Sequence, residues 1–357
     1  MQATAKITPF QFYTILFLSR IFSLVTYVSS VRGEISTSGE VIAVVIMTVV
    51  LLVTSIPIFI FIKKDSYSSI LTRASCVSNS FMKIVCIVYF LFFIYKGIIT
   101  SARFELLLGS VMFPEINVLF FVAMLLIASG FITCRGIEGL GRASVIFLIP
   151  VLCALAFVFL SLIKDFDTLN FSAVYSHEYS TIADAAVYSS SRTGELAAIV
   201  VLQPFIKDHK AKHLFRWIIS ISAVIVLTEF MISGVLGGFG ENQLFDMYSL
   251  SVLADFGFIE RMDAIISCIW MICSAVKLSL IFYLCKTLLI TFFSKRKTTI
   301  YVSVCCVVVF VGTVILSMSI VNFADIIKSY LTIIFYVLTV VIIPSVVLIG
   351  EKVKVKK

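Results

Sequence analysis

Ten apolar stretches, each about as long as a helix that crosses a lipid bilayer, follow one another along this chain of 357 residues. Crossing the hydrocarbon core takes about 20 apolar residues in an α-helix, and hydrocarbon offers no water to satisfy irregular backbone. The chain is 61% hydrophobic and 13% charged, whereas a soluble domain has about 25% charged residues. We therefore predict one all-α integral membrane domain over 1–357. The predicted spans are 8–30, 38–62, 80–102, 116–134, 143–163, 185–206, 214–238, 262–293, 298–320 and 326–349.

Basic residues are distributed unevenly between the predicted loops. With the N-terminus placed in the cytoplasm, the loops on that side carry most of them, which is the positive-inside pattern. An even number of spans then places both termini in the cytoplasm. The expected inner set is Lys6, Lys63, Lys64, Arg73, Arg135, Arg142, Lys207, Lys210, Lys212, Arg216, Lys295, Arg296, Lys297, Lys352, Lys354, Lys356 and Lys357. The expected outer set is Arg32, Arg103, Lys164, Arg261 and Lys328.

The net charge of +8 is therefore attributed to membrane topology and to the anionic inner leaflet. We expect a lipid bilayer as the surrounding partner and no nucleic acid. The cysteines lie mostly inside the spans without a Cys-x-x-Cys pair, which indicates buried, unpaired thiols. His209 and His213 are four residues apart and could hold a metal on one helix, but the favoured interpretation is a solvated basic loop. No nucleophile elbow, phosphate loop or catalytic carboxylate pair is present, so we expect neither an enzyme nor a cofactor.

Few ionisable residues lie inside the predicted spans. A charge near the bilayer centre costs about 2.5–3.5 kcal/mol on insertion scales, so such residues are usually functional or neutralise one another. Lys83 and Lys96, near the ends of one span, are expected to extend to the interface, and Lys286 is interpreted in the same way. The deeper residues are Arg20, Arg192, Glu195, Glu229 and Lys277.

Polar residues interrupt the span 185–206 with the run Ser189-Ser190-Ser191-Arg192-Thr193-Gly194-Glu195. We predict a helix break at Gly194 that lines a binding cavity. The first span contains a possible counterpart, Ser19-Arg20 followed by Ser23, and these two spans begin the two halves of the chain. Five spans reverse the topology, so the pattern favours an inverted repeat of 8–163 and 185–349. The first span has no glycine between Met1 and Gly33, and the glycine for a break is found only in the sixth.

Three groups of short motifs together resemble a known family. They are Ile7-Thr8-Pro9-Phe10-Gln11-Phe12; Gly194-Glu195 with Pro204-Phe205-Ile206-Lys207 and Lys212; and Gly238-Phe239-Gly240 with Phe258-Ile259-Glu260-Arg261-Met262-Asp263, Trp270 and Lys277. In this order and spacing they resemble the B subunit of bacterial spore germinant receptors. These endospore germination permeases belong to the amino acid–polyamine–organocation transporter superfamily.

The resemblance implies a fold of the amino acid permease type in the spore inner membrane. It also implies partner A and C subunits and a small nutrient, an amino acid, bound near the membrane midplane between the first and sixth spans. Transporters of this superfamily have a glycine-containing break in the first span, and this chain departs from that pattern. The expected ligand-binding residues are Ser19, Arg20, Ser23, Ser191, Arg192, Thr193, Gly194 and Glu195.

Each charged candidate has an alternative interpretation. Arg192 and Glu195 could form a cavity ion pair that contacts a zwitterionic ligand, with exposed N–H groups of the half-helix favouring its carboxylate. They could instead belong to a structural pair with Arg20 or Glu229 that only neutralises buried charge. Arg20 could hold a ligand carboxylate in a bidentate manner or pair with Glu195.

Glu229 and Lys277 are candidates for ion or proton coupling. Glu229 could carry a proton, although a satisfied partner of Lys277 or Arg20 is favoured. By the resemblance, Lys277 supplies a fixed ammonium where relatives bind sodium; alternatively it pairs with a carboxylate or with backbone carbonyls. The predicted function is nutrient germinant sensing. The alternatives are a proton-coupled secondary amino acid transporter, in which Glu195 or Glu229 carries the proton, and a scaffold that has lost ligand binding.

Overall fold

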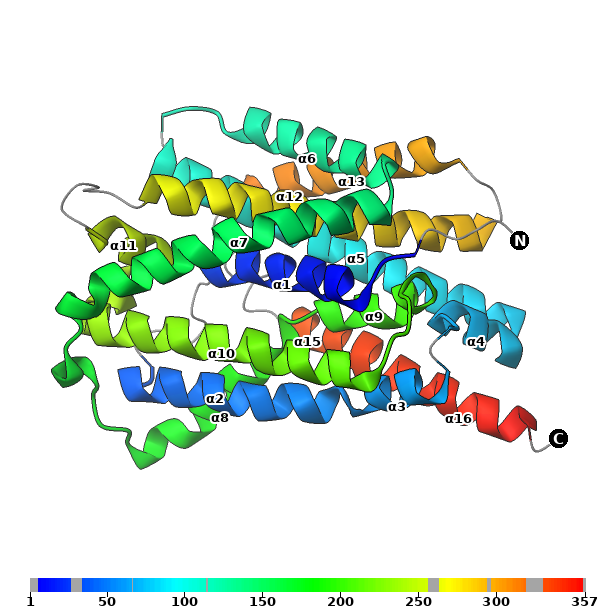
Figure 1. Cartoon of the computed structure of the whole chain (residues 1–357), viewed down its shortest axis with the longest axis horizontal. Helices are drawn as coiled ribbons and strands as arrows, with labels where there is room; N and C mark the ends of the chain where they lie inside the picture. Colours follow the sequence, from blue (N-terminus) through cyan, green and yellow to red (C-terminus); the bar gives the residue numbers. More distant parts are fainter. Residues whose placement is uncertain are drawn as a thin grey trace.

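Long helices lie roughly along one axis of the molecule (Figure 1). The computed structural model describes residues 6–26, 34–65, 67–113, 115–255, 263–293, 297–318 and 330–355, without the side chains of 241–242 and 352–355. Within these ranges the secondary structure is helical, apart from one isolated parallel bridge between Ile7 and Ile206. Several sequence predictions concern residues outside this description: the span ends at 27–30, 319–320 and 326–329, the motif at 258–262, and the charges of Arg32, Arg261, Lys295, Arg296, Lys328, Lys352, Lys354, Lys356 and Lys357.

Most of the described helices coincide with predicted spans, whereas two further helices, Ile70–Val77 and Asp246–Leu253, lie in segments predicted as loops. The described helices are α1 (Pro9–Val25), α2 (Thr37–Thr54), α3 (Ile56–Lys64), α4 (Ile70–Val77), α5 (Asn79–Leu107), η1 (Leu108–Met112), α6 (Leu119–Cys134), α7 (Ile137–Ser161), η2 (Leu162–Asp165), η3 (Thr168–Asn170), η4 (Ser176–Glu178), α8 (Tyr179–Ser191), α9 (Glu195–Leu202), η5 (Gln203–Phe205), α10 (Ala211–Leu236), η6 (Gly237–Asn242), α11 (Asp246–Leu253), α12 (Asp263–Phe293), α13 (Thr298–Ser317), α15 (Tyr330–Tyr336), η7 (Val337–Ile342) and α16 (Ile343–Val355).

Seven helical segments of the described chain are long and apolar enough to cross a membrane, so this is a multi-pass membrane protein. They are Thr37–Lys64, Asn79–Met112, Ile137–Asp165, Ala211–Gly240, Asp263–Phe293, Thr298–Ser317 and Tyr330–Glu351. The apolar helices α1 and α6 are shorter, and the sixth predicted span is divided between α8 and α9. The count of ten crossings and the inverted repeat therefore stay predictions.

Local sequence explains where the first helices begin and break. At α1 the Thr8 hydroxyl accepts a hydrogen bond from the backbone N–H of Gln11, whose side chain accepts from the Thr8 N–H, and Pro9 occupies the first turn. This reciprocal cap satisfies two N–H groups that the helix itself cannot bond. Between α2 and α3 the chain turns at Ser55, two residues before Pro57, because proline has no N–H to continue the helical bonding.

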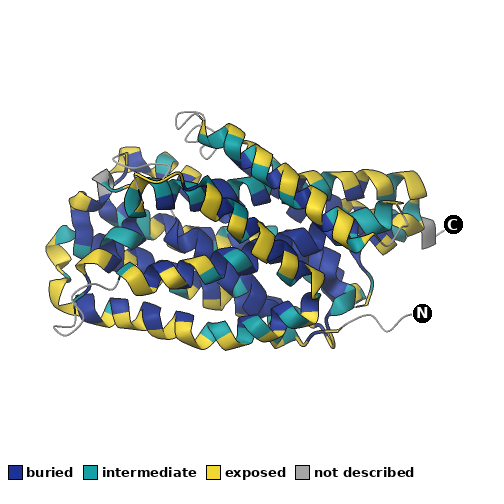
Figure 2. Cartoon of the chain, turned by 90° about the horizontal axis from the view of Figure 1, so that it is seen from above, coloured by how far each residue is buried: buried dark blue, intermediate teal, exposed yellow. Residues whose placement is uncertain are grey.

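Helix α1 lies inside the bundle and packs against α7, α9, α10, α11 and α12 (Figure 1). Its residues from Phe12 to Val25 are buried, apart from the half-buried Phe17. Exposed residues gather on the outer faces of the peripheral helices, while the interior is buried (Figure 2). This arrangement surrounds the polar groups of α1 with protein rather than lipid, which is where charges inside a membrane protein are tolerated.

Candidate functional site

The predicted break in the sixth span is present. Helix α8 ends at Ser191, α9 begins at Glu195, and the three residues between them form a turn in which the Thr193 N–H donates to the Ser190 carbonyl at 2.9 Å. Gly194 itself has ordinary right-handed helical angles, with φ −65°. Its importance is steric, since a Cβ there would lie 2.8 Å from both Phe92 and Lys96 of α5. The glycine allows α5 to approach the broken helix closely.

A buried ion pair joins the break to α12 and α1. The Lys277 Nζ donates to the Glu195 Oε1 at 2.9 Å, and the Ser19 Oγ donates to the same oxygen at 3.0 Å. The side chains of Glu195 and Lys277 are only 4% and 8% exposed. In this low-dielectric interior a paired charge is tolerated, and an unpaired one is costly. Lys277 thus pairs with the Glu195 carboxylate, one of the alternatives considered for this lysine.

Lys277 also binds the backbone and a hydroxyl of α1. Its ammonium donates to the Ser23 Oγ at 2.5 Å and to the Ser19 carbonyl at 3.3 Å. Its three acceptors are therefore all oxygens, two from α1 and one from the start of α9. The ring of Phe22 faces the same ammonium, with its centroid 5.6 Å from Nζ, close enough for a cation–π contribution.

Two arginines cross between α1 and the broken span. The Arg20 Nη2 of α1 donates to the Ser189 carbonyl of α8 at 3.4 Å. In return, the Arg192 Nη2 donates to the Ser23 carbonyl of α1 at 3.3 Å. Each arginine thus reaches the backbone close to the other one, so the two Ser-Arg steps that the sequence singled out do lie side by side.

Helix α5 supplies two cations that the sequence assigned elsewhere. Arg103 was predicted to lie in an outer loop, but α5 continues to Leu107 and Arg103 is buried, with its Nη1 donating to the Thr26 carbonyl at 3.5 Å. Lys96 was expected to extend to the interface. It lines the same small cavity as Lys277 and its charge acts on Glu195. The observed α5 extends beyond the predicted span, so Lys96 lies well inside the helix rather than near its end.

The third of the lysines expected at the interface is also buried. Lys286 of α12 is 8% exposed, its Nζ donates to the Thr133 carbonyl at 3.4 Å, and it lies 4.0 Å from the centroid of the Tyr283 ring. The expectation of an exposed ammonium is therefore wrong. A backbone carbonyl and a ring face replace water around it.

The polar groups enclose a very small cavity. It is about 30 Å³ in volume, and its walls include Ser23, Lys96, Arg103, Arg192 and Lys277. Because one water needs about 10–15 Å³ of such space, the cavity has room for only a few water molecules. Next to the cluster, the rings of Phe22 and Phe104 stack on either side of Trp270, with centroid separations of 5.8 Å and 4.6 Å. The site in this conformation is therefore closed.

The remaining site candidates have different surroundings. Ser191 bonds its own helix, donating to the Tyr188 carbonyl at 2.6 Å. The Thr193 hydroxyl and the Glu195 Oε2 are buried without a hydrogen-bond partner among the described residues. Glu229 is buried on α10, and the charges that act most strongly on Lys277 are those of Glu195, Arg20 and Arg103.

The loop that carries His209 is exposed at Lys207, Asp208 and Lys210, and His213 is half-buried, but His209 itself is not solvated. His209 is 3% exposed and its Nε2 lies 2.8 Å from the Tyr13 hydroxyl of α1. Burial, together with a smaller contribution from the charge of His213, lowers the pKa of His209 to about 4. In the part of the chain that the structure describes, no group of three or more His, Cys, Asp or Glu residues could hold a metal ion.

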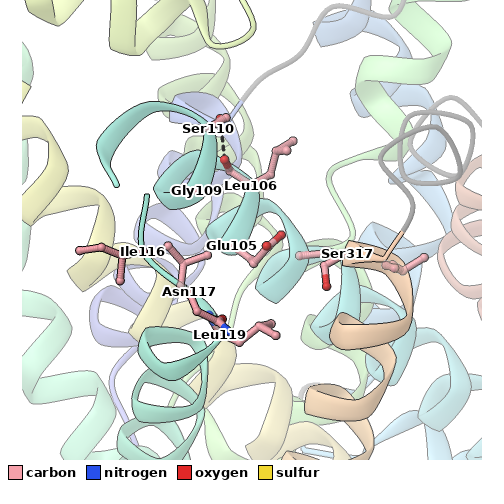
Figure 3. A pocket seen from close by; sticks show the side chains of 11 residues that line it. Glu105, Leu106, Gly109, Ser110, Ile116, Asn117, Leu119 and Ser317 are labelled. Atoms are coloured by element: carbon pink, nitrogen blue, oxygen red, sulfur yellow. Dashed lines mark hydrogen bonds between the residues drawn. The ribbon is translucent and has the colours of Figure 1, made fainter. Parts of the chain in front are cut away.

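A second and larger cavity lies away from this cluster (Figure 3). It is about 330 Å³ in volume and lies between the end of α5 with η1, the start of α6 and the end of α13. Glu105, Ser110, Asn117 and Ser317 supply its polar lining. None of the predicted ligand-binding residues lines this cavity, so it is separate from the predicted site.

Comparison with known proteins identifies the family. The model of a family described as spore germination protein matches residues 6–324. This chain belongs to the spore germination protein family. The matched region contains α1, the broken span and α12, so all three parts of the buried cluster belong to the family domain of this spore germination protein.

The fold of this spore germination protein is similar to that of a solved transporter. The structure is a Na⁺-coupled sialic acid symporter in a substrate-bound outward-open state, with a TM-score of 0.65 and 14% identity over 95% of this chain and 80% of that chain. At this identity the likeness shows a shared transporter-like fold. No curated protein sequence matches the chain significantly. Family and fold point to a permease-like membrane protein rather than to an enzyme.

Proposed function

We propose that this spore germination protein is the nutrient-sensing B subunit of a germinant receptor and that it binds an amino acid germinant where α1 passes the break between α8 and α9. The observation that carries the proposal is the buried Glu195–Lys277 pair at 2.9 Å, placed at that break and joined to α1. The proposal includes ten spans in a five-plus-five inverted repeat, both termini in the cytoplasm, A and C subunits as partners, and the spore inner membrane as the location.

The chemistry of the cluster suits a zwitterion. Arg20, Arg103 and Arg192 present guanidinium groups near the break, and such groups bind a carboxylate with two parallel hydrogen bonds. The first N–H groups of α9 favour the same charge. The Glu195 Oε2, buried without a hydrogen bond from any described residue, can accept from a ligand ammonium. The Thr193 hydroxyl is available in the same way.

Lys277 replaces a bound cation in this proposal. Its ammonium holds two oxygens of α1 and the Glu195 carboxylate together, and oxygen donors of this kind are the ligands of alkali and alkaline-earth ions. A covalently attached ammonium fixes α1, α9 and α12 without an ion gradient. This supports a ligand response that does not depend on sodium.

Ligand binding requires the bundle to open. Pockets for small molecules usually have volumes of about 300–1,000 Å³, and the cluster encloses about 30 Å³. A germinant therefore binds a conformation in which α1, α5 and the broken span have separated. A ligand shifts such an equilibrium by the difference in its affinity for the two states. The opened packing is the signal that we propose passes to the partner subunits.

Two substitutions test the ligand site in spores that depend on this receptor. Glu195→Gln and Arg20→Ala are expected to abolish the germination response to the nutrient while protein level and complex assembly persist. Glu105→Gln is the matched control, because this carboxylate lies in the separate cavity of Figure 3 and its loss should leave the response intact. Normal germination of both site variants on every nutrient would refute the site.

Uptake measurements distinguish the sensing role from the alternative function, a proton-coupled secondary amino acid transporter. Purified protein in proteoliposomes should be stabilised against heat by the germinant, because a ligand stabilises the state that it binds, without accumulation of labelled amino acid. Saturable accumulation driven by a pH gradient, lost in Glu195→Gln, would favour the transporter and overturn the sensing role.

A further inference from the structure

A long groove opens on the side of the bundle at the inner ends of α1 and α10. It is about 700 Å³ in volume and is formed by α1, α7 and α10. Its walls are mostly apolar, with contributions from Phe10, Phe17, Leu148, Leu152 and Val224. Phe10 is 61% and Leu152 40% exposed, so the groove opens outward. In a membrane-embedded bundle the surrounding medium at this depth is lipid.

The end of the groove nearest the predicted cytoplasmic side is basic. Arg216 and His213 line it, and Lys210 and Lys212 are close enough for their charges to act on His213. No carboxylate belongs to its lining. Within the described residues, the Arg216 guanidinium has neither a hydrogen bond nor an ion pair. Charge complementarity therefore favours an anionic group at this end and apolar chains along the rest.

His213 is oriented as a donor at the same position. Its Nδ1 accepts a hydrogen bond from the Lys210 backbone N–H at 3.2 Å. A neutral imidazole that accepts at Nδ1 carries its proton on Nε2, so Nε2–H is left to donate to an acceptor oxygen. Together with the guanidinium of Arg216, this gives N–H donors of the kind that bind phosphate oxygens.

The dimensions of the groove match one leaflet. From Arg216 to Val224, eight residues of α10 rise about 12 Å, and half of a bilayer's hydrocarbon core is about 15 Å. A headgroup phosphate at Arg216 therefore places its acyl chains beside Phe17, Leu148 and Val224. We propose that this groove is a binding site for an anionic phospholipid of the inner leaflet, with the phosphate on Arg216 and His213.

The position of the groove links the lipid to α1. Tyr13 lines it and also hydrogen-bonds His209 at 2.8 Å. About two turns further along the same helix are Ser19 and Arg20 of the buried cluster. A lipid in the groove packs α1 against α7 and α10 at its inner end. Its binding is a property of this surface and does not depend on which germinant the protein recognises.

Tryptophan fluorescence reports directly on this site. The chain has two tryptophans; Trp217 lines the groove, whereas Trp270 is fully buried between Phe22 and Phe104. The full-length protein is reconstituted in vesicles that contain brominated phosphatidylglycerol or brominated phosphatidylcholine with identical chains. We expect Trp217 to be quenched at about fivefold lower mole fraction of the anionic lipid, which is the effect of one basic residue near an anionic lipid.

Variants distinguish a specific lipid-binding site from unspecific contact with lipid. Arg216→Gln should bring the two quenching curves together, whereas Arg216→Lys and the distant control Arg135→Gln should keep them apart. Leu152→Phe should reduce quenching by both lipids by filling the groove. Equal quenching by the two lipids in the unmodified protein would overturn the proposal, as would an unchanged preference in Arg216→Gln. Loss of the preference on addition of millimolar inorganic phosphate would assign the basic end to free phosphate and likewise overturn it.

Discussion

Replacing Lys277 by methionine removes the ammonium that neutralises Glu195 in the centre of the bundle. The Glu195 Oε1 then retains only the hydrogen bond from the Ser19 Oγ, and the Ser23 Oγ loses the donor at 2.5 Å. Breaking a buried ion pair by removing one partner costs about 3–5 kcal/mol because the other charge stays buried. Both side chains are less than 10% exposed, so we expect Lys277→Met to lose a free energy of unfolding in this range.

The double variant isolates the pair from the effects of either substitution alone. Glu195→Gln keeps the shape of the side chain and removes its charge. If the two groups interact as the 2.9 Å contact indicates, Lys277→Met combined with Glu195→Gln should recover most of the stability lost in Lys277→Met. We expect a coupling energy of about 2–3 kcal/mol, at the upper end of the range for directly contacting residues.

Reaction of buried cysteines provides the assay. Cys273 lies one turn before Lys277 and is fully buried, as are Cys285 and Cys305, so a thiol-reactive dye labels them only after unfolding. Free energies from equilibrium unfolding in mixed micelles, measured for the unmodified protein, both single variants and the double variant, give the coupling energy. A Lys277→Met protein as stable as the unmodified one would refute the reasoning, and so would strictly additive losses in the double variant.

Two further predictions concern the break and the N-terminal end of α1. Gly194→Ala places a Cβ 2.8 Å from Phe92 and Lys96, so it should destabilise the protein by about 1–3 kcal/mol, typical of overpacking; Gly238→Ala, whose Cβ meets nothing within 4 Å, is the control, and equal stability of the two variants would contradict the steric argument. His209 has its pKa lowered from 6.5 to about 4, so its neutral form is favoured in the folded protein; its contribution to stability is present above about pH 6.5 and is lost as the pH falls towards 4. That loss amounts to about 2 kcal/mol between pH 7 and pH 5. Thermal unfolding should show that the stability of the unmodified protein falls between pH 7 and pH 5 and that it falls less in His209→Gln. An equal loss of stability in the two proteins would disprove the role of His209.

The sequence located the break in the sixth span but not the reason for its glycine. Four hydroxyl residues, two charges and a glycine in an apolar stretch indicated an interrupted helix, and the interruption is observed between Ser191 and Glu195. Gly194 was predicted to mark the break itself. In the structure Gly194 has helical angles, and a small residue is required there because α5 packs closely against it. The residues of the sixth span do not reveal that contact.

Charged residues of α5 illustrate the limit of hydropathy. Arg103 was placed in a loop because the apolar run weakens after 102, yet the helix extends to Leu107 and carries Arg103 into the cluster. Lys96 was expected to extend to the interface because it lies near the end of the predicted span. Hydropathy reports depth along a helix, whereas the surroundings of a side chain depend on which face of the helix it occupies and on which helix lies opposite.

By itself, the sequence determined that this chain is a multi-pass membrane protein, because so many long apolar stretches cannot be hidden from water in any other way. It also determined the interrupted span and the family resemblance, since both depend on residues adjacent in the chain. Only the tertiary structure decided that Lys277 pairs with Glu195, that α5 contributes two cations, and that α1, α7 and α10 leave a groove with a basic end. The ion pair joins residues that are 82 positions apart, and such contacts are set by helix packing rather than by local pattern.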